Sequence, residues 1–169
     1  SEPIDLFEPS QVIEAMCRRM DGLAKSPAMT SAYIGGGSPS CLPLQLLMKL
    51  VRKAAKLLRP AAEFTVEVNP EQGGCELFEK LKTENVNRVS FGAQSFHNRQ
   101  LEFLGRRHDV RAIYDCLSAA RGAGIENLSL DLIFAPPGQS RQNGQKCLEK
   151  AIDTEPKHIS AYSLSYEQG

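Results

Sequence analysis

The stretch Ala32-Tyr33-Ile34-Gly35-Gly36-Gly37-Ser38-Pro39-Ser40 decides the fold. A short apolar run leads into three consecutive glycines, and glycine tolerates backbone angles closed to other residues and lets another molecule touch the main chain. At the end of a strand, such a run predicts main-chain N–H and C=O groups that face a ligand. The run lacks both the G-x-G-x-x-G spacing of dinucleotide sites and the lysine of a P-loop, so alone it does not identify the ligand.

Helix-like and strand-like segments alternate on both sides of the glycines. Apolar residues spaced three or four apart predict helices, whereas alternating or β-branched runs predict strands. The predicted helices are residues 10–24, 42–58, 75–84, 98–105, 110–122 and 141–153, and the predicted strands are residues 32–37, 64–68, 89–93, 128–134 and 159–166. We expect Arg59-Pro60 to end the second helix.

This order of segments predicts an α/β fold with a parallel sheet, because βαβ units join parallel strands by right-handed crossovers. Two architectures fit the order, an open doubly wound sheet and a partial (β/α) TIM-like barrel. A helix comes first and a strand comes last, so we expect a barrel that is incomplete at both ends.

Composition limits the classes of function. The chain has 169 residues, 41% hydrophobic and 24% charged, with a formal net charge of zero, which is typical of one globular domain and provides no field to attract nucleic acid. No apolar stretch approaches the roughly 20 residues of a transmembrane segment. The five cysteines are far apart, and we expect them to be reduced in a cytoplasmic protein.

Polar side chains recur toward the carboxyl ends of the later predicted strands. These are Glu67, Gln94 and Asp131, with Ser163 and Ser165 alternating along the last strand. In parallel α/β folds, ligands bind at this edge of the sheet. The sequence therefore predicts one binding site in which these groups face the glycine run.

A structural ion pair is the alternative interpretation of the two acids. A carboxylate buried without a partner costs several kcal/mol, and Arg88, Arg106, Arg107 or His108 could neutralise it. The spacing of the three histidines does not favour a zinc hydrolase, and no serine lies in a G-x-S-x-G turn.

Six motifs in order carry a resemblance to a known family. They are Tyr-Ile-Gly-Gly-Gly-Ser-Pro-Ser (33–40), Glu-Val-Asn-Pro (67–70), Asn-Arg-Val-Ser-Phe-Gly-Ala-Gln-Ser-Phe (87–96), Leu-Gly-Arg-Arg-His (104–108), Leu-Asp-Leu-Ile-Phe (130–134) with Pro-Gly-Gln (137–139), and His-Ile-Ser-Ala-Tyr-Ser-Leu-Ser-Tyr-Glu (158–167). With these motifs the chain resembles the radical S-adenosylmethionine (SAM) proteins related to oxygen-independent coproporphyrinogen III oxidase. The Gln-Ser-Phe and Leu-Gly-Arg-x-His variants resemble the heme chaperone branch, HemW, more than the oxidase.

The resemblance implies which residues bind SAM. In the family the glycine motif contacts the methionine part of SAM, and polar strand ends line the rest of the pocket. The implied SAM-binding residues are Gly35, Gly36, Gly37, Ser38, Glu67, Gln94, Arg106, Asp131 and Ser165.

The resemblance also implies a [4Fe–4S] cluster held by a C-x3-C-x2-C motif after the first strand of the barrel. That strand and loop would precede residue 10, so we expect residues 1–169 to be a fragment of a radical SAM core domain without metal ligands of its own. Because thiolates hold such clusters, we expect the cluster in the parent protein and an inactive chain in isolation.

Two other functions remain open at this point. One is a cluster-free module that binds SAM, or heme or a porphyrin through His97 or His108, without chemistry. The other is a (β/α) enzyme whose glycine run holds the phosphate of a metabolite.

Overall fold

The computed structural model describes residues 8–23 and 27–164, and its helices and strands alternate along the chain. Two short 3₁₀ turns, Pro39–Cys41 and Pro70–Gln72, each follow one of the first two strands. The α-helices are α1 (Pro9–Leu23), α2 (Leu44–Ala55), α3 (Cys75–Thr83), α4 (Asn98–Phe103), α5 (Val110–Gly122) and α6 (Arg141–Asp153), and the strands are β1 (Met29–Ile34), β2 (Leu58–Val68), β3 (Arg88–Gln94), β4 (Asn127–Phe134) and β5 (His158–Ser163).

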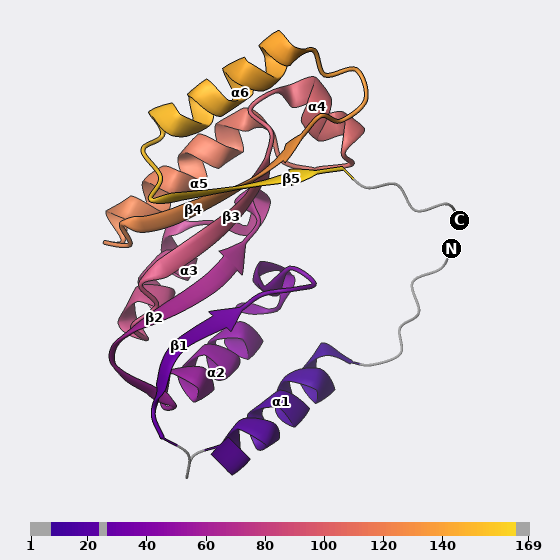
Figure 1. Cartoon of the computed structure of the whole chain (residues 1–169). Helices are drawn as coiled ribbons and strands as arrows, with labels where there is room; N and C mark the ends of the chain where they lie inside the picture. Colours follow the sequence, from indigo (N-terminus) through magenta and orange to yellow (C-terminus); the bar gives the residue numbers. More distant parts are fainter. Residues whose placement is uncertain (1–7, 24–26, 165–169) are drawn as a thin grey trace.

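The five strands form one parallel sheet in the order β1-β2-β3-β4-β5, and the sheet curls into half of a barrel (Figure 1). A doubly wound sheet reverses its strand order at a switch point, which puts helices on both faces. Here the order never reverses. Of the two predicted architectures, the structure therefore has the partial TIM-like barrel.

The two faces of the sheet differ in chemistry because side chains alternate along each strand. On the helix-covered face lie fully buried apolar residues such as Phe64, Val66, Phe91 and Leu130, which pack with the helices in one core. The opposite face carries Thr65, Glu67, Ser90, Ser129 and Asp131 instead. Polar side chains on that concave face leave it free to line a binding site.

Two predicted boundaries are wrong near β1 and β2. The glycines at 35–37 were expected inside a strand, but β1 ends at Ile34 because Gly36 and Gly37 adopt positive φ. Arg59 and Pro60 were expected to end a helix, but α2 ends at Ala55 and both residues lie in β2.

Pro60 is tolerated in a strand because the β1–β2 ladder is interrupted around it. The register jumps from Met29 opposite Leu58 to Ser31 opposite Glu63, so the residues between them form a bulge. A proline lacks the N–H that a regular ladder uses, and bulges and edge strands are where sheets accommodate it. Within the described ranges, we find no helix with the length and apolar character needed to cross a bilayer.

Candidate functional site

A polar pocket of about 200 Å³ lies at the carboxyl edge of the sheet. Ten residues line it: Gly37, Ser38, Glu67, Val68, Asn69, Ser90, Gly92, Gln94, Arg106 and Asp131. The strand-end groups Glu67, Gln94 and Asp131 thus meet at one place, together with the last glycine of the run and Arg106. The pocket is smaller than the about 300–1,000 Å³ of a typical small-molecule site.

Glu67 ties the glycine loop to the sheet. Its Oε2 accepts a hydrogen bond from the backbone amide of Gly36 at 2.9 Å, and its Oε1 accepts one from the Tyr33 hydroxyl at 2.7 Å. Burial raises the pKa of Tyr33 to about 12, and the bond to Glu67 adds to the shift. The Tyr33 side chain is half exposed as a whole, but its hydroxyl end lies against the carboxylate. The loop is therefore held in place before any ligand arrives.

The glycines of this loop serve two physical needs. A Cβ on Gly35 would lie 2.4 Å from Tyr33 Cε1 and 2.6 Å from the Glu67 carboxyl carbon, so no side chain fits there. Gly36 and Gly37 have φ of +77° and +50°, which glycine adopts without steric cost. Ser38 continues the positive-φ run at +59° and leads into the turn Pro39–Cys41.

A bulge near the end of β3 places Gln94. The register between β3 and β4 gains one residue between Phe91 and Gln94, and Gln94 has a φ of +63°. Such bulges are over-represented beside active sites because they re-aim a side chain. A Cβ on Gly92 would lie 2.9 Å from Gln94 Nε2 and 3.1 Å from Asn69 Oδ1, so the two amides flank this glycine.

Asp131 lies on the concave face beside two hydroxyls. The Ser90 hydroxyl lies 3.3 and 3.4 Å from the two carboxylate oxygens, and Ser160 of β5 is directly opposite Asp131 in the ladder. Burial raises the pKa of Asp131, and nearby Glu67 adds to the rise, while the hydroxyls of Ser160 and Ser90 oppose it. The carboxyl therefore binds a proton more tightly than a free aspartate.

Arg106 lines the same pocket as the two carboxylates. It lies between α4 and α5, where its backbone amide donates to Leu101 O at 2.9 Å. Its side-chain Nε is buried and has no hydrogen-bond partner among the residues that the structure describes. A buried guanidinium N–H without an acceptor is costly, and this unpaired donor belongs to a residue that lines the polar pocket.

The prediction for the serines of the last strand needs correction. Four lining residues, Val68, Asn69, Ser90 and Gly92, were not predicted. Ser163 lies opposite Phe134, on the opposite side of the sheet from Asp131, and the serine that faces Asp131 is Ser160. Ser165 lies outside the described residues. Asn69 and Ser90 line the pocket but were not predicted, although Asn69 follows Glu67 by two positions and Ser90 precedes Gly92 by two.

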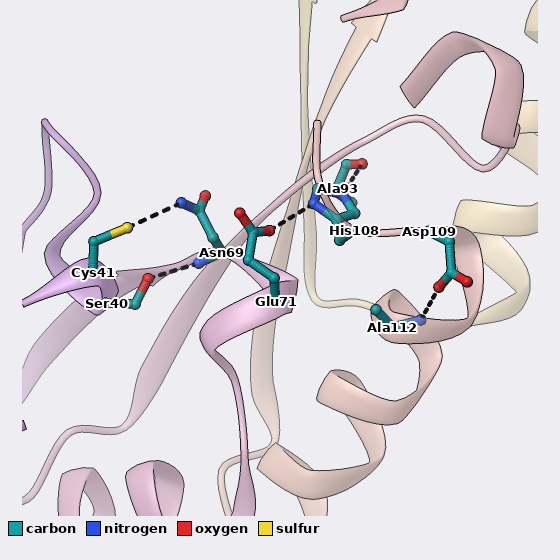
Figure 2. Close-up of polar contacts among 8 residues, drawn as sticks. All are labelled: Ser40, Cys41, Asn69, Glu71, Ala93, His108, Asp109 and Ala112. Carbon is teal, nitrogen blue, oxygen red and sulfur yellow. Dashed lines mark hydrogen bonds and ion pairs between the residues drawn. The ribbon is translucent and has the colours of Figure 1, made fainter. Parts of the chain in front are cut away.

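The structural ion pair is not the role of these acids in the described part of the chain. Within residues 8–23 and 27–164, neither Glu67 nor Asp131 forms an ion pair. Asn69 contacts the turn Pro39–Cys41: its backbone N–H donates to Ser40 Oγ at 3.0 Å (Figure 2).

His108 is unsuited to be a heme ligand. Its side chain is 1% exposed, and both ring nitrogens contact protein atoms, Glu71 Oε2 at 2.9 Å and the Ala93 carbonyl oxygen at 3.3 Å. His97, in contrast, is exposed.

Comparison with known proteins identifies the family. The model of the Radical SAM superfamily matches residues 10–151. The chain belongs to the radical SAM superfamily. Over 173 aligned residues it is 35% identical to the heme chaperone HemW of Bacillus subtilis, an alignment that covers 99% of this chain and 44% of HemW. A mitochondrial radical SAM domain-containing protein 1 of Danio rerio is 36% identical over 149 residues, with 87% of this chain and 34% of that protein covered.

Solved radical SAM proteins share the fold. Coproporphyrinogen III oxidase (HemN) of Escherichia coli superposes with a TM-score of 0.84 at 22% identity, over 98% of this chain and 39% of the oxidase. The chain thus spans less than half the length of each of these relatives. The resemblance deduced from the six motifs, to radical SAM proteins of the HemN and HemW type, is confirmed.

Radical SAM proteins in general use SAM and a [4Fe–4S] cluster, as in the Kitasatospora setae methyltransferase TsrM, whose structure contains the cluster. The residues of this chain do not fit the cluster. The spacing C-x3-C-x2-C does not occur in the sequence. In the described ranges, no three His, Cys, Asp or Glu side chains are grouped so as to hold a metal ion.

Proposed function

We propose that the chain forms the SAM-binding part of a radical SAM protein of the HemW heme chaperone and coproporphyrinogen III oxidase group. The observation that carries the proposal is the convergence of Arg106, Glu67 and Asp131 on one pocket. Among the described residues, Arg106 Nε also has no acceptor. SAM offers a carboxylate to a guanidinium, and an ammonium, a sulfonium and ribose hydroxyls to carboxylates. The nine residues implied by the resemblance are the proposed binding set.

Each pocket group has a proposed task. Arg106 binds the methionine carboxylate of SAM through a charge-assisted hydrogen bond. The backbone amides of Gly37 and Ser38 contact the amino acid end. Asp131, with Ser90 beside it, and Gln94 orient the ribose. In a radical SAM protein with SAM bound, the cluster supplies the electron. The residues of this chain would bind and orient SAM.

The phosphate-binding alternative is disfavoured by charge. A phosphate held by the glycine loop would need its free amides, and the Gly36 amide already donates to the Glu67 carboxylate. A phosphate there would meet a like charge, which is destabilising at this distance.

Heme or a porphyrin is a second proposed partner, supported by the name of the HemW relatives. We further propose a reducing compartment, the cytoplasm. Cys17, Cys41, Cys75, Cys116 and Cys147 are all free thiols, which is typical of that environment.

Calorimetric titration of SAM into the purified chain tests the proposal, with Arg106→Gln and the matched variant Arg107→Gln. Arg106 lines the pocket, whereas the neighbouring Arg107 is exposed. We expect Arg106→Gln to weaken SAM binding by about tenfold to a hundredfold, the cost of a charged hydrogen bond, and Arg107→Gln to leave it unchanged. Saturable binding of sugar phosphates with none of SAM would contradict the proposal. Titration of heme into the same protein, followed by the Soret absorption band, tests heme as the second proposed partner.

A further inference from the structure

Three separate segments converge on the pocket. Asn69 follows β2, Gln94 ends β3, and Arg106 lies between α4 and α5. None of these residues belongs to the middle of a regular element, so sheet hydrogen bonds do not by themselves fix their relative positions. Some other contact has to join the three segments if the pocket is to keep its shape without a ligand.

His108 makes that contact, as Figure 2 shows. It lies two residues after Arg106, and its ring sits between the other two segments. Nδ1 is 2.9 Å from Oε2 of Glu71, which lies two residues after Asn69, and Nε2 is 3.3 Å from the carbonyl oxygen of Ala93, which precedes Gln94. The ring is nearly fully buried, with 1% of the side chain exposed.

Both neighbours of the ring are hydrogen-bond acceptors. A carboxylate and a carbonyl oxygen each accept, so a ring N–H of His108 donates to one of them in either tautomer. Because the ring is buried, the contact is shielded from water, and such bonds are strong there. Glu71 also lies near the Cys116 thiol. Burial and the Glu71 charge raise the pKa of Cys116 to about 12, so the thiol stays neutral.

The carbonyl that His108 holds also closes a strained turn. Ser95 N donates to Ala93 O at 2.7 Å across Gln94, whose φ is +63°. A three-residue turn with a positive φ at its central residue is rare and strained, and a non-glycine residue there pays an added steric cost. Such a conformation persists only where the surroundings fix it. The bond from His108 to the same oxygen is one such contact.

We propose that His108, held by Glu71, is a positioning residue that joins the three loops and keeps Asn69, Gln94 and Arg106 in the arrangement that receives SAM. The inference rests on the proposed SAM-binding function. His108 does not line the pocket and acts through the residues on either side of it.

Two variants separate this role from simple packing. Glu71→Gln removes the negative charge at a side chain that is 27% exposed, so the chain is expected to fold. His108→Gln keeps an N–H donor but removes the ring that spans the contacts to Glu71 and Ala93. His97→Gln is the matched control, because His97 is exposed and makes no side-chain hydrogen bond in the described part of the chain.

The first measurement needs no SAM. Backbone ¹H–¹⁵N spectra of the ligand-free chain are compared between the wild type and the variants. The backbone amides of Asn69, Gln94 and Arg106 should shift in Glu71→Gln and in His108→Gln but not in His97→Gln. Unchanged amides at those three residues in Glu71→Gln would overturn the inference.

The second measurement is the SAM dissociation constant by calorimetry. Glu71→Gln and His108→Gln should each weaken SAM binding by about tenfold, whereas His97→Gln should not. The double variant should bind SAM no more weakly than the weaker-binding single variant, because both substitutions remove the same coupled contact. Wild-type affinity in the folded Glu71→Gln variant, or effects that multiply in the double variant, would also overturn it. If the unmodified chain binds no SAM, the proposed function fails, and the ligand-free spectra alone decide whether His108 joins the three loops.

Discussion

The carboxylate of Glu67 accepts the backbone amide of Gly36 at 2.9 Å, across 31 positions of the sequence. The acidic side chain thus accepts the hydrogen bond of a glycine-loop amide, a donor that binds a phosphate in many other proteins. The same carboxylate receives the Tyr33 hydroxyl, so one residue of β2 fixes both the end of β1 and the loop after it.

Replacing Glu67 with glutamine should loosen this arrangement. Glutamine replaces one of the two accepting oxygens with an NH2 group, which donates and does not accept, so we expect Gly36 to exchange its amide hydrogen faster. The pKa of Tyr33 should fall from about 12 part of the way toward 10.0, because burial remains while the carboxylate is lost. Ultraviolet titration of the phenolate, with Tyr33→Phe to identify the signal, measures the shift. An unchanged Tyr33 titration would show that the two residues do not interact.

Gly35→Ala should lower the stability of the fold, unlike alanine at a glycine with open space around it. The added Cβ would meet Tyr33 and Glu67 at 2.4–2.6 Å. Overpacking of this kind costs about 1–3 kcal/mol, and we expect denaturant unfolding to show that loss together with loss of SAM binding.

Gly122→Ala is the control, because a Cβ at the end of α5 has nothing within 4 Å and alanine favours helices. We expect Gly122→Ala to be neutral or slightly stabilising. Equal effects of the two variants would contradict the close packing at Gly35.

Asp131→Asn should stabilise the ligand-free chain in a pH-dependent way. The pKa of Asp131 is raised in the folded chain, chiefly by burial, so the folded state favours the protonated carboxyl. The stability that the protonated carboxyl contributes is fully present below the ordinary pKa of 3.8 and is lost as the pH rises through the folded pKa. An amide has no such dependence. We expect a melting temperature about 2–4 °C higher at neutral pH, with the gain gone at about pH 4.

Thermal melts followed by circular dichroism check this, with Asp115→Asn as control because that side chain is 71% exposed. A gain of the same size at both pH values would contradict a buried, ionisable Asp131.

The cysteines should separate into two classes of reactivity. Cys41 and Cys75 are exposed, whereas Cys17, Cys116 and Cys147 are buried. Burial also raises the pKa of Cys116 to about 12, and only the thiolate reacts. Alkylation of the native chain, mapped by peptide mass spectrometry, should label the first pair quickly and the other three only after unfolding. Rapid labelling of Cys116 would contradict the packing of α5 on the rest of the core.

Periodicity in the sequence was enough to predict all five strands and their parallel arrangement. It could not predict that Pro60 lies in β2, since that depends on how Leu58 pairs with Met29 and Glu63 with Ser31, which are far away in the sequence. Side-chain direction near a strand end likewise depends on register. For this reason Ser163 was expected at the site although Ser160 is the serine opposite Asp131.

The site was predictable where charge stands out in an apolar strand, as at Glu67 and Asp131. Asn69 and Ser90 were missed because small neutral residues are common in strands and turns and carry no such contrast. The positive φ of Gln94 was also beyond prediction, because it comes from an extra residue in β3 relative to β4. The polar strand ends were visible in the sequence, but the bulge that aims one of them was not.

Addition of SAM to the ¹⁵N-labelled chain tests the proposed site most directly. We predict saturable amide shifts at Gly37, Gly92, Gln94 and Arg106, around the polar pocket. Val12, Met16 and Met20, which line the neighbouring apolar cavity but not the polar pocket, should change little. No shifts at the pocket residues at saturating SAM, or shifts confined to Val12, Met16 and Met20, would contradict SAM binding at the carboxyl edge of the sheet.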